Sequence, residues 1–220
     1  MSTIFGSSVL DSINKEKVNL NFISSSKDDN NNPILRDSLH YLFKWADLFL
    51  GASPNSVMEK QQLPASGDKH DFLSLAPYCW PDPKSPNGLP YICQDKRGVN
   101  PEFYAVPDYA NLLDMITRVK TLALAYHFSH NETYASKAAN LLRVWFLDGH
   151  TKMNPNMQFS EVVPGKNNGT SHGIIGAKDF PEIIDSLGMI ENSSSWTSQD
   201  QQRMKGWFTH YLEWLVHSQS

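Results

Sequence analysis

The 220-residue sequence has no excess of positive charge and no long apolar run. It contains 19 lysines and arginines against 23 aspartates and glutamates, which gives a net charge of −4. A nucleic-acid partner needs a basic face, so this balance argues against one, although it leaves room for a locally basic cleft. No stretch approaches the roughly 18 apolar residues of a membrane span, so we expect no membrane partner. The N-terminal residues show no clear secretory signal.

Cysteine is also scarce, with only Cys79 and Cys93 in the whole chain. Their spacing does not fit a CxxC metal or redox site. A disulfide between them would close a loop and indicate an oxidising compartment. Two free, buried thiols fit the sequence equally well. The eight histidines show no HExxH or comparable spacing, so the sequence predicts no metal site.

What the chain does contain is a set of amphipathic segments behind a polar start. Residues 1–33 end in a low-complexity run, which predicts a flexible N-terminal lead-in. Residues 34–220 are the predicted folded domain. Apolar residues at three- and four-residue spacing predict helices over 34–50, from 107, from 133, over 180–189 and over 198–217. Period-two alternation is sustained nowhere, so we expect an all-α fold whose helix pairs either bundle or stack around an axis.

A proline-rich loop over 68–101 interrupts the helices. Its prolines exclude a helix, and they can hold the aromatic rings of Tyr78 and Trp80 in fixed places. Arg97 can pair with a carboxylate, and Asn100 can donate amide hydrogen bonds. The segment is either a surface loop with its own small core or a loop that faces a ligand.

A second irregular segment, 148–178, is rich in glycine, asparagine and proline. Asn154 and Asn156 offer donors and acceptors for a sugar, although asparagine also caps and turns the backbone. His172 can act as a base near neutral pH, or it is a surface residue. Asp179 and Glu182 fit a helix start better than a glycosidase pair.

Several of these segments resemble a known family. The runs HDFLSLAPYCWPDP, GLPY and RGVNPE, and later MNPN, PG and GII, are similar to the alginate-lyase-like polysaccharide lyases, and the match spans about residues 66–220. The resemblance implies an incomplete α/α toroid of antiparallel helix hairpins, whose long loops form one side of a cleft. Glu161 departs from the pattern, because the family leads us to expect glutamine there.

The resemblance also implies an activity: β-elimination on an acidic, uronate-containing polysaccharide such as alginate or glucuronan, without a cofactor. The expected location is extracellular or periplasmic. The predicted substrate-binding residues are Tyr78, Trp80, Arg97, Asn100, Asn154, Asn156 and His172.

The family's Asn-Asn-His signature occurs nowhere in the sequence. We therefore expect the front half of the domain, truncated before its catalytic signature, with no catalytic residue assigned. The alternative is a non-catalytic carbohydrate-binding or helical interaction module.

Overall fold

A computed structural model describes residues 33–218, with side chains from residue 35 onwards. Apart from Pro33, the predicted flexible lead-in lies outside the described residues. The chain divides into two compact units, Met1–Lys44 and Trp45–Ser220. Helix α2, Pro33–Leu50, begins in the first unit and ends in the second, and it matches the helix predicted over 34–50.

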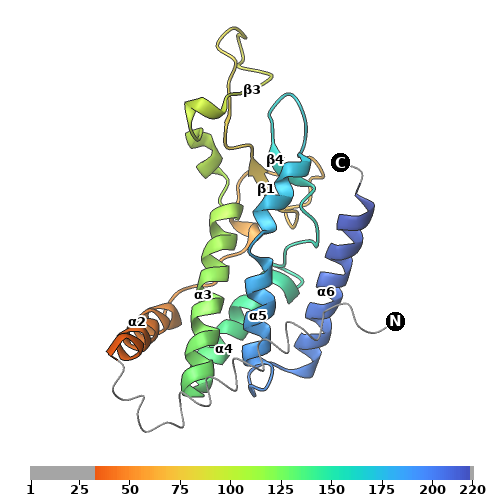
Figure 1. Cartoon of the computed structure of the whole chain (residues 1–220). Helices are drawn as coiled ribbons and strands as arrows, with labels where there is room; N and C mark the ends of the chain where they lie inside the picture. Colours follow the sequence, from red (N-terminus) through yellow and green to blue (C-terminus); the bar gives the residue numbers. More distant parts are fainter. Residues whose placement is uncertain (1–32, 219–220) are drawn as a thin grey trace. The chain divides into compact units, whose positions relative to one another are not determined.

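The second unit is built on helices whose bounds agree closely with those predicted. They are α3 (Asp108–Ser129), α4 (Glu132–Leu142), α5 (Phe180–Ile190) and α6 (Ser198–His217), labelled in Figure 1. Only two residues join α3 to α4, which makes them an antiparallel pair. Helix α3 packs against both α4 and α5. A π-helical turn, Arg143–Leu147, continues α4 and packs against α6.

The core lies between these helices. One face of α3 contributes five fully buried apolar side chains, Leu112, Met115, Ile116, Val119 and Leu122. Small residues on α4, among them Ala135, Ala138 and Ala139, are fully buried and allow α3 to pack closely against α4. Burial of each large aliphatic side chain stabilises the fold by about 1.5–3 kcal/mol.

Aromatic rings fill the space between α5, α6 and the π-helical turn. Phe146 lies 4.7 Å from Trp207 in an edge-to-face arrangement, and Phe180 lies 5.3 Å from Tyr211. Each such pair stabilises the fold by about 0.5–1.5 kcal/mol beyond the contribution of the buried apolar area.

The two irregular segments contain short strands, which the sequence did not predict, and one pair of them joins the segments. Strand β1 (Leu73–Leu75) pairs in parallel with β4 (Phe159–Val162), and β2 (Cys79–Trp80) pairs antiparallel with β3 (Ile92–Cys93). With two to four residues each, they are too short to show a period-two pattern. The two long loops are therefore neighbours. No helix in the described range is long and apolar enough to cross a membrane.

Candidate functional site

A disulfide closes the proline-rich loop. Cys79 and Cys93 are bonded at an S–S distance of 2.00 Å and are paired residues of β2 and β3. Of the two alternatives that the sequence left open, the disulfide is the one the structure contains. Buried Ala76 and Val163 pack beside Cys79, with the ring of Tyr91 against them. This small core thus combines residues of the proline-rich loop with Val163 of the second irregular segment.

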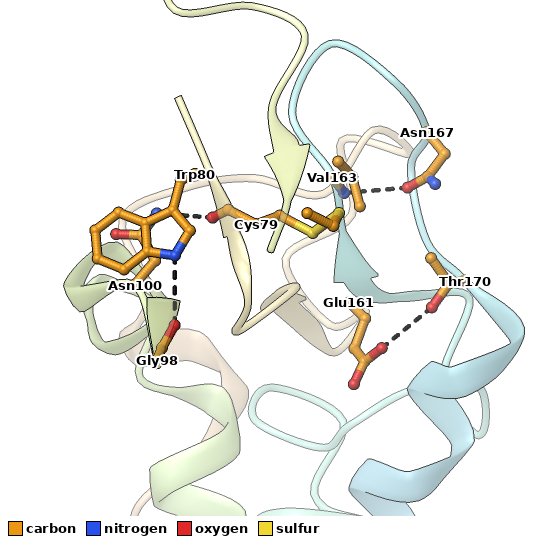
Figure 2. The surroundings of a disulfide bond; sticks show 9 residues. Cys79, Trp80, Gly98, Asn100, Glu161, Val163, Asn167 and Thr170 are labelled. Atoms are coloured by element: carbon orange, nitrogen blue, oxygen red, sulfur yellow. Dashed lines mark hydrogen bonds between the residues drawn. A yellow bond between two sulfur atoms is a disulfide. The ribbon is translucent and has the colours of Figure 1, made fainter. Parts of the chain in front are cut away.

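Trp80 and Arg97 form a stacked pair on this loop. The guanidinium carbon of Arg97 lies 3.9 Å from the centre of the indole ring, and the indole N–H donates to the carbonyl of Gly98 at 3.3 Å (Figure 2). Arg97 is exposed, and none of the ion pairs found within residues 33–218 includes it. Nearby in the sequence, Tyr78 is 44% exposed. The loop therefore offers aromatic surface together with an available cation.

Asn100, in contrast, serves the loop itself. It is only 4% exposed. Its side-chain amide donates to the carbonyl of Cys79 at 2.9 Å (Figure 2). Its side-chain oxygen accepts from the backbone N–H of Glu102 at 3.1 Å. Both polar ends of the Asn100 side chain are thus bonded to backbone groups of the protein, one of them at the disulfide residue Cys79.

Asn154 and Asn156 lie together on the second loop. The amide nitrogen of Asn154 donates to Asp68 at 2.9 Å and to Asp71 at 2.8 Å, and that of Asn156 donates to Asp71 at 3.0 Å. Because carboxylates accept only, the amide nitrogens of both residues, and not their oxygens, face these aspartates. The oxygen of Asn156 accepts from the backbone N–H of Gln158. The side-chain oxygen of Asn154 and the second amide N–H of Asn156 are therefore the groups left for a ligand.

Sequence reasoning missed the two aspartates that hold these amides. Asp71 is 6% exposed and also accepts from the hydroxyl of Ser66 at 2.7 Å. The N–H of His70 and the amide of Asn154 lower the pKa of Asp68. The available signal was their place at the family motif, since Asp71 lies within the run HDFLSLAPYCWPDP and Asp68 lies two residues before it.

A second missed feature is a buried ion pair beneath the loop. Lys60 Nζ contacts Asp108 at 2.9 Å, and neither side chain is exposed. The same ammonium donates to the carbonyls of Val57 and Lys69. Burial lowers the pKa of Lys60, and burial raises the pKa of Asp108 to about 6 against the opposing effect of Lys60. One Asp108 oxygen lacks a hydrogen-bond partner among the described residues.

The remaining predicted residues are more scattered. His172 is exposed in the 3-10 helix Ser171–Ala177. Asp179 and Glu182 bind different lysines, Lys178 at 2.5 Å and Lys120 at 2.9 Å. Within residues 33–218, no group of three or more histidine, cysteine, aspartate or glutamate side chains is arranged to hold a metal ion.

The predicted residues thus form two separate clusters, Trp80 with Arg97 and Asn154 with Asn156. Backbone pairing of β1 with β4 holds their loops side by side, and Tyr91 N–H donates to the carbonyl of Pro164. Among the side chains of residues 33–218, no hydrogen bond or ring contact found in the structure joins the two clusters directly. An open depression of about 670 Å³ along α4 contains none of the predicted residues.

Comparisons with known proteins agree with the resemblance seen in the sequence. A family profile for alginate lyase matches residues 56–220. The chain is similar to a crystal structure of an alginate lyase from Bacteroides ovatus at 1.60 Å resolution, with 42% identity and a TM-score of 0.82. The similarity covers 89% of this chain and 52% of that one, so the chain spans about half that protein's length. A comparison with curated proteins gives no match.

The neighbour's similarity and the antiparallel helix pairs confirm the predicted all-α fold, an incomplete α/α toroid. The family profile covers well over half of the sequence. The chain therefore belongs to the alginate lyase family.

Proposed function

We propose that this chain is part of a polysaccharide lyase that acts by β-elimination on an acidic, uronate-containing polysaccharide such as alginate or glucuronan. Family membership supports the reaction class. The observation that carries the proposal of an anionic ligand is the exposed Arg97 guanidinium, held on Trp80 and joined to no acid in the described part of the chain. The disulfide supports an extracellular or periplasmic location.

The chemistry of β-elimination explains why such a cation is useful. The enzyme must neutralise the uronate carboxylate, remove the proton at C5 and protonate the leaving oxygen at C4. Arg97 offers a planar set of N–H donors that suits a carboxylate. Tyr78 and Trp80 offer faces on which a sugar ring can lie. These residues bind and neutralise the substrate, and we assign no proton-transfer group in this chain.

The second cluster contributes to the same site in our proposal. Asn154 accepts a hydrogen bond from a ring hydroxyl through its oxygen, and Asn156 donates one through its remaining N–H. His172 is exposed and available to the ligand. Asn100 acts indirectly, because its amide holds the loop that carries Trp80.

The test combines binding and turnover. We expect an alginate oligosaccharide to bind in calorimetry, and we expect Arg97→Ala and Trp80→Ala each to weaken that binding about tenfold or more. Lys84→Ala, an exposed cation on the same loop, is the matched control and should bind normally. Equal affinity of all four proteins for the oligosaccharide would contradict the proposed site.

A second candidate is non-catalytic binding of the same polysaccharide. The observation in its favour is that the sequence contains no Asn-Asn-His run. Incubation with alginate and with glucuronan, followed by the absorbance of unsaturated products, tests this chain for turnover. Sustained product formation excludes the non-catalytic module. Binding with no product is expected of both candidates, because we assign no proton-transfer group in this chain.

A further inference from the structure

Two non-glycine residues in the described range have positive φ, His130 and Glu161, both at 54°. His130 is readily explained, because it is the C-cap of α3 and its backbone N–H donates to the carbonyl of Tyr126. Glu161 lies inside β4, where no helix ends. A left-handed conformation costs stability in a residue with a Cβ, so Glu161 needs another explanation.

The surroundings impose this conformation on Glu161. The register of β1 and β4 shifts between the pairs Leu73–Phe159 and Leu75–Val162, which places one extra residue on β4. The hydroxyl of Ser74 accepts a hydrogen bond from the backbone N–H of Glu161 at 2.9 Å. It also lies 3.1 Å from the hydroxyl of Ser160. A bulge held in this way turns a side chain in a direction that a regular strand would not allow.

Only one of the two oxygens of the redirected Glu161 carboxylate is hydrogen-bonded within the described residues. Thr170 donates its hydroxyl to one oxygen of Glu161 at 3.3 Å, and Figure 2 shows the other oxygen turned away from Thr170. Among residues 33–218, no hydrogen-bond partner is found for that second oxygen. No lysine or arginine forms an ion pair with Glu161 there either. One oxygen of the Glu161 carboxylate is therefore left as an acceptor that no described residue uses.

We propose that Glu161 contacts the bound polysaccharide and accepts hydrogen bonds from ring hydroxyl groups, as a specificity-determining residue. This inference rests on the proposed function. A carboxylate repels a second carboxylate, so Glu161 favours the hydroxyl-bearing edge of a uronate ring on the β4 side and keeps the uronate carboxyl away from it. Strained residues that their neighbours hold in place are concentrated at such sites.

The proposal makes stability and binding change in opposite directions. We expect Glu161→Gly to raise the Tm by about 2–4 °C, because glycine accepts positive φ without a steric penalty. The same variant should bind an alginate tetrasaccharide about tenfold more weakly, as expected when a charged hydrogen-bonding group is lost. Glu161→Gln keeps the Cβ and the strain, so it should leave the Tm unchanged and still weaken binding.

His130→Gly is the matched control, because it relieves the same φ at a helix end. It should raise the Tm to a similar extent and leave the affinity for the tetrasaccharide unchanged. Unchanged affinity in both Glu161 variants, with normal binding by the wild type, would overturn this inference and leave the proposed function standing. A lower Tm for Glu161→Gly would also overturn it. If the wild type does not bind the tetrasaccharide, both the proposed function and this inference are wrong.

Discussion

Lys60 shows how far a single residue can depart from its usual environment. A lysine ordinarily remains solvated, yet here its side chain is completely buried and its three N–H groups meet Asp108 and two backbone carbonyls. Asp108 also accepts from the backbone N–H of Leu73 at 2.9 Å. The pair therefore joins the start of α3 to β1 and to the loop that carries Asp71.

Replacing Lys60 by methionine should destabilise the protein by about 3–5 kcal/mol, because Asp108 would remain buried without its partner. Urea denaturation measures this change as a lower transition midpoint. The double variant Lys60→Met with Asp108→Leu removes both charges and should recover most of the loss. If the double variant is as unstable as the single one, the unpaired charge is not the cause.

At the scale of elements, the start of α6 is fastened by a capping box and an ion pair. The hydroxyl of Thr197 accepts from the backbone N–H of Asp200 at 3.1 Å, and Asp200 accepts from the backbone N–H of Thr197 at 3.0 Å. Arg143, from the π-helical turn, donates to both oxygens of the same carboxylate at 3.1 and 2.6 Å. From the sequence alone, either Thr197 or Ser198 is predicted to cap this helix, and the structure has Thr197 as the N-cap.

The stabilisation that Asp200 gives to the start of α6 should depend on pH. Hydrogen bonding to Arg143 lowers the pKa of Asp200 to about 2, with burial opposing the shift. Since the folded pKa lies below the unfolded value near 3.8, the stabilisation is present above about pH 4 and is lost as the pH falls through about 2. We expect a contribution of about 1–2 kcal/mol, reduced because the Arg143 side chain is 36% exposed.

Comparison with Asp200→Asn measures this contribution across the pH range. The free-energy difference between the wild type and the variant should shrink as the pH falls from 5 to about 2. The raised pKa of Asp108 acts in the opposite direction, since its protonation becomes favourable in the folded state below about pH 6. Both proteins contain Asp108, so its effect cancels in the difference. A pH-independent difference would contradict the role of Asp200.

At the scale of the whole molecule, α6 exposes apolar surface. From the sequence we expect such surface around Trp207, Phe208 and Trp214. Trp207 does not fit this expectation, because it is buried and its indole donates to the carbonyl of Met153 at 2.8 Å. The exposed large apolar side chains of α6 are Leu212, at 47%, and Val216, at 67%, which lie one turn apart on the helix.

We expect the protein to self-associate through this face at high concentration, because adjacent exposed apolar side chains favour contact. Sedimentation velocity over a concentration series should show a rising average mass. The double variant Leu212→Glu with Val216→Glu should lower it without changing the Tm. His210→Glu, an exposed position on the same helix, adds charge outside the apolar pair and should leave the association intact.

Local sequence patterns were sufficient for the helices. Sequence patterns place the start of α3 and both ends of α6 within a residue or two of the structure. They succeed because helical periodicity and capping act between near neighbours. The prolines of the two irregular loops likewise exclude an α-helix locally, although the short strands β1 to β4 within these loops were not predicted. The family resemblance likewise required only short runs of residues in order.

The candidate site depended on contacts between distant residues, and these were not predictable. Asn154 meets Asp71 across 83 positions, and Lys60 meets Asp108 across 48. Likewise, the sequence permitted a disulfide without requiring it, because bonding depends on where β2 and β3 bring the two cysteines. Periodicity specifies which side of a helix is apolar. Only the packing of the two loops decides which asparagine each aspartate binds. The same packing decides that the backbone is strained at Glu161.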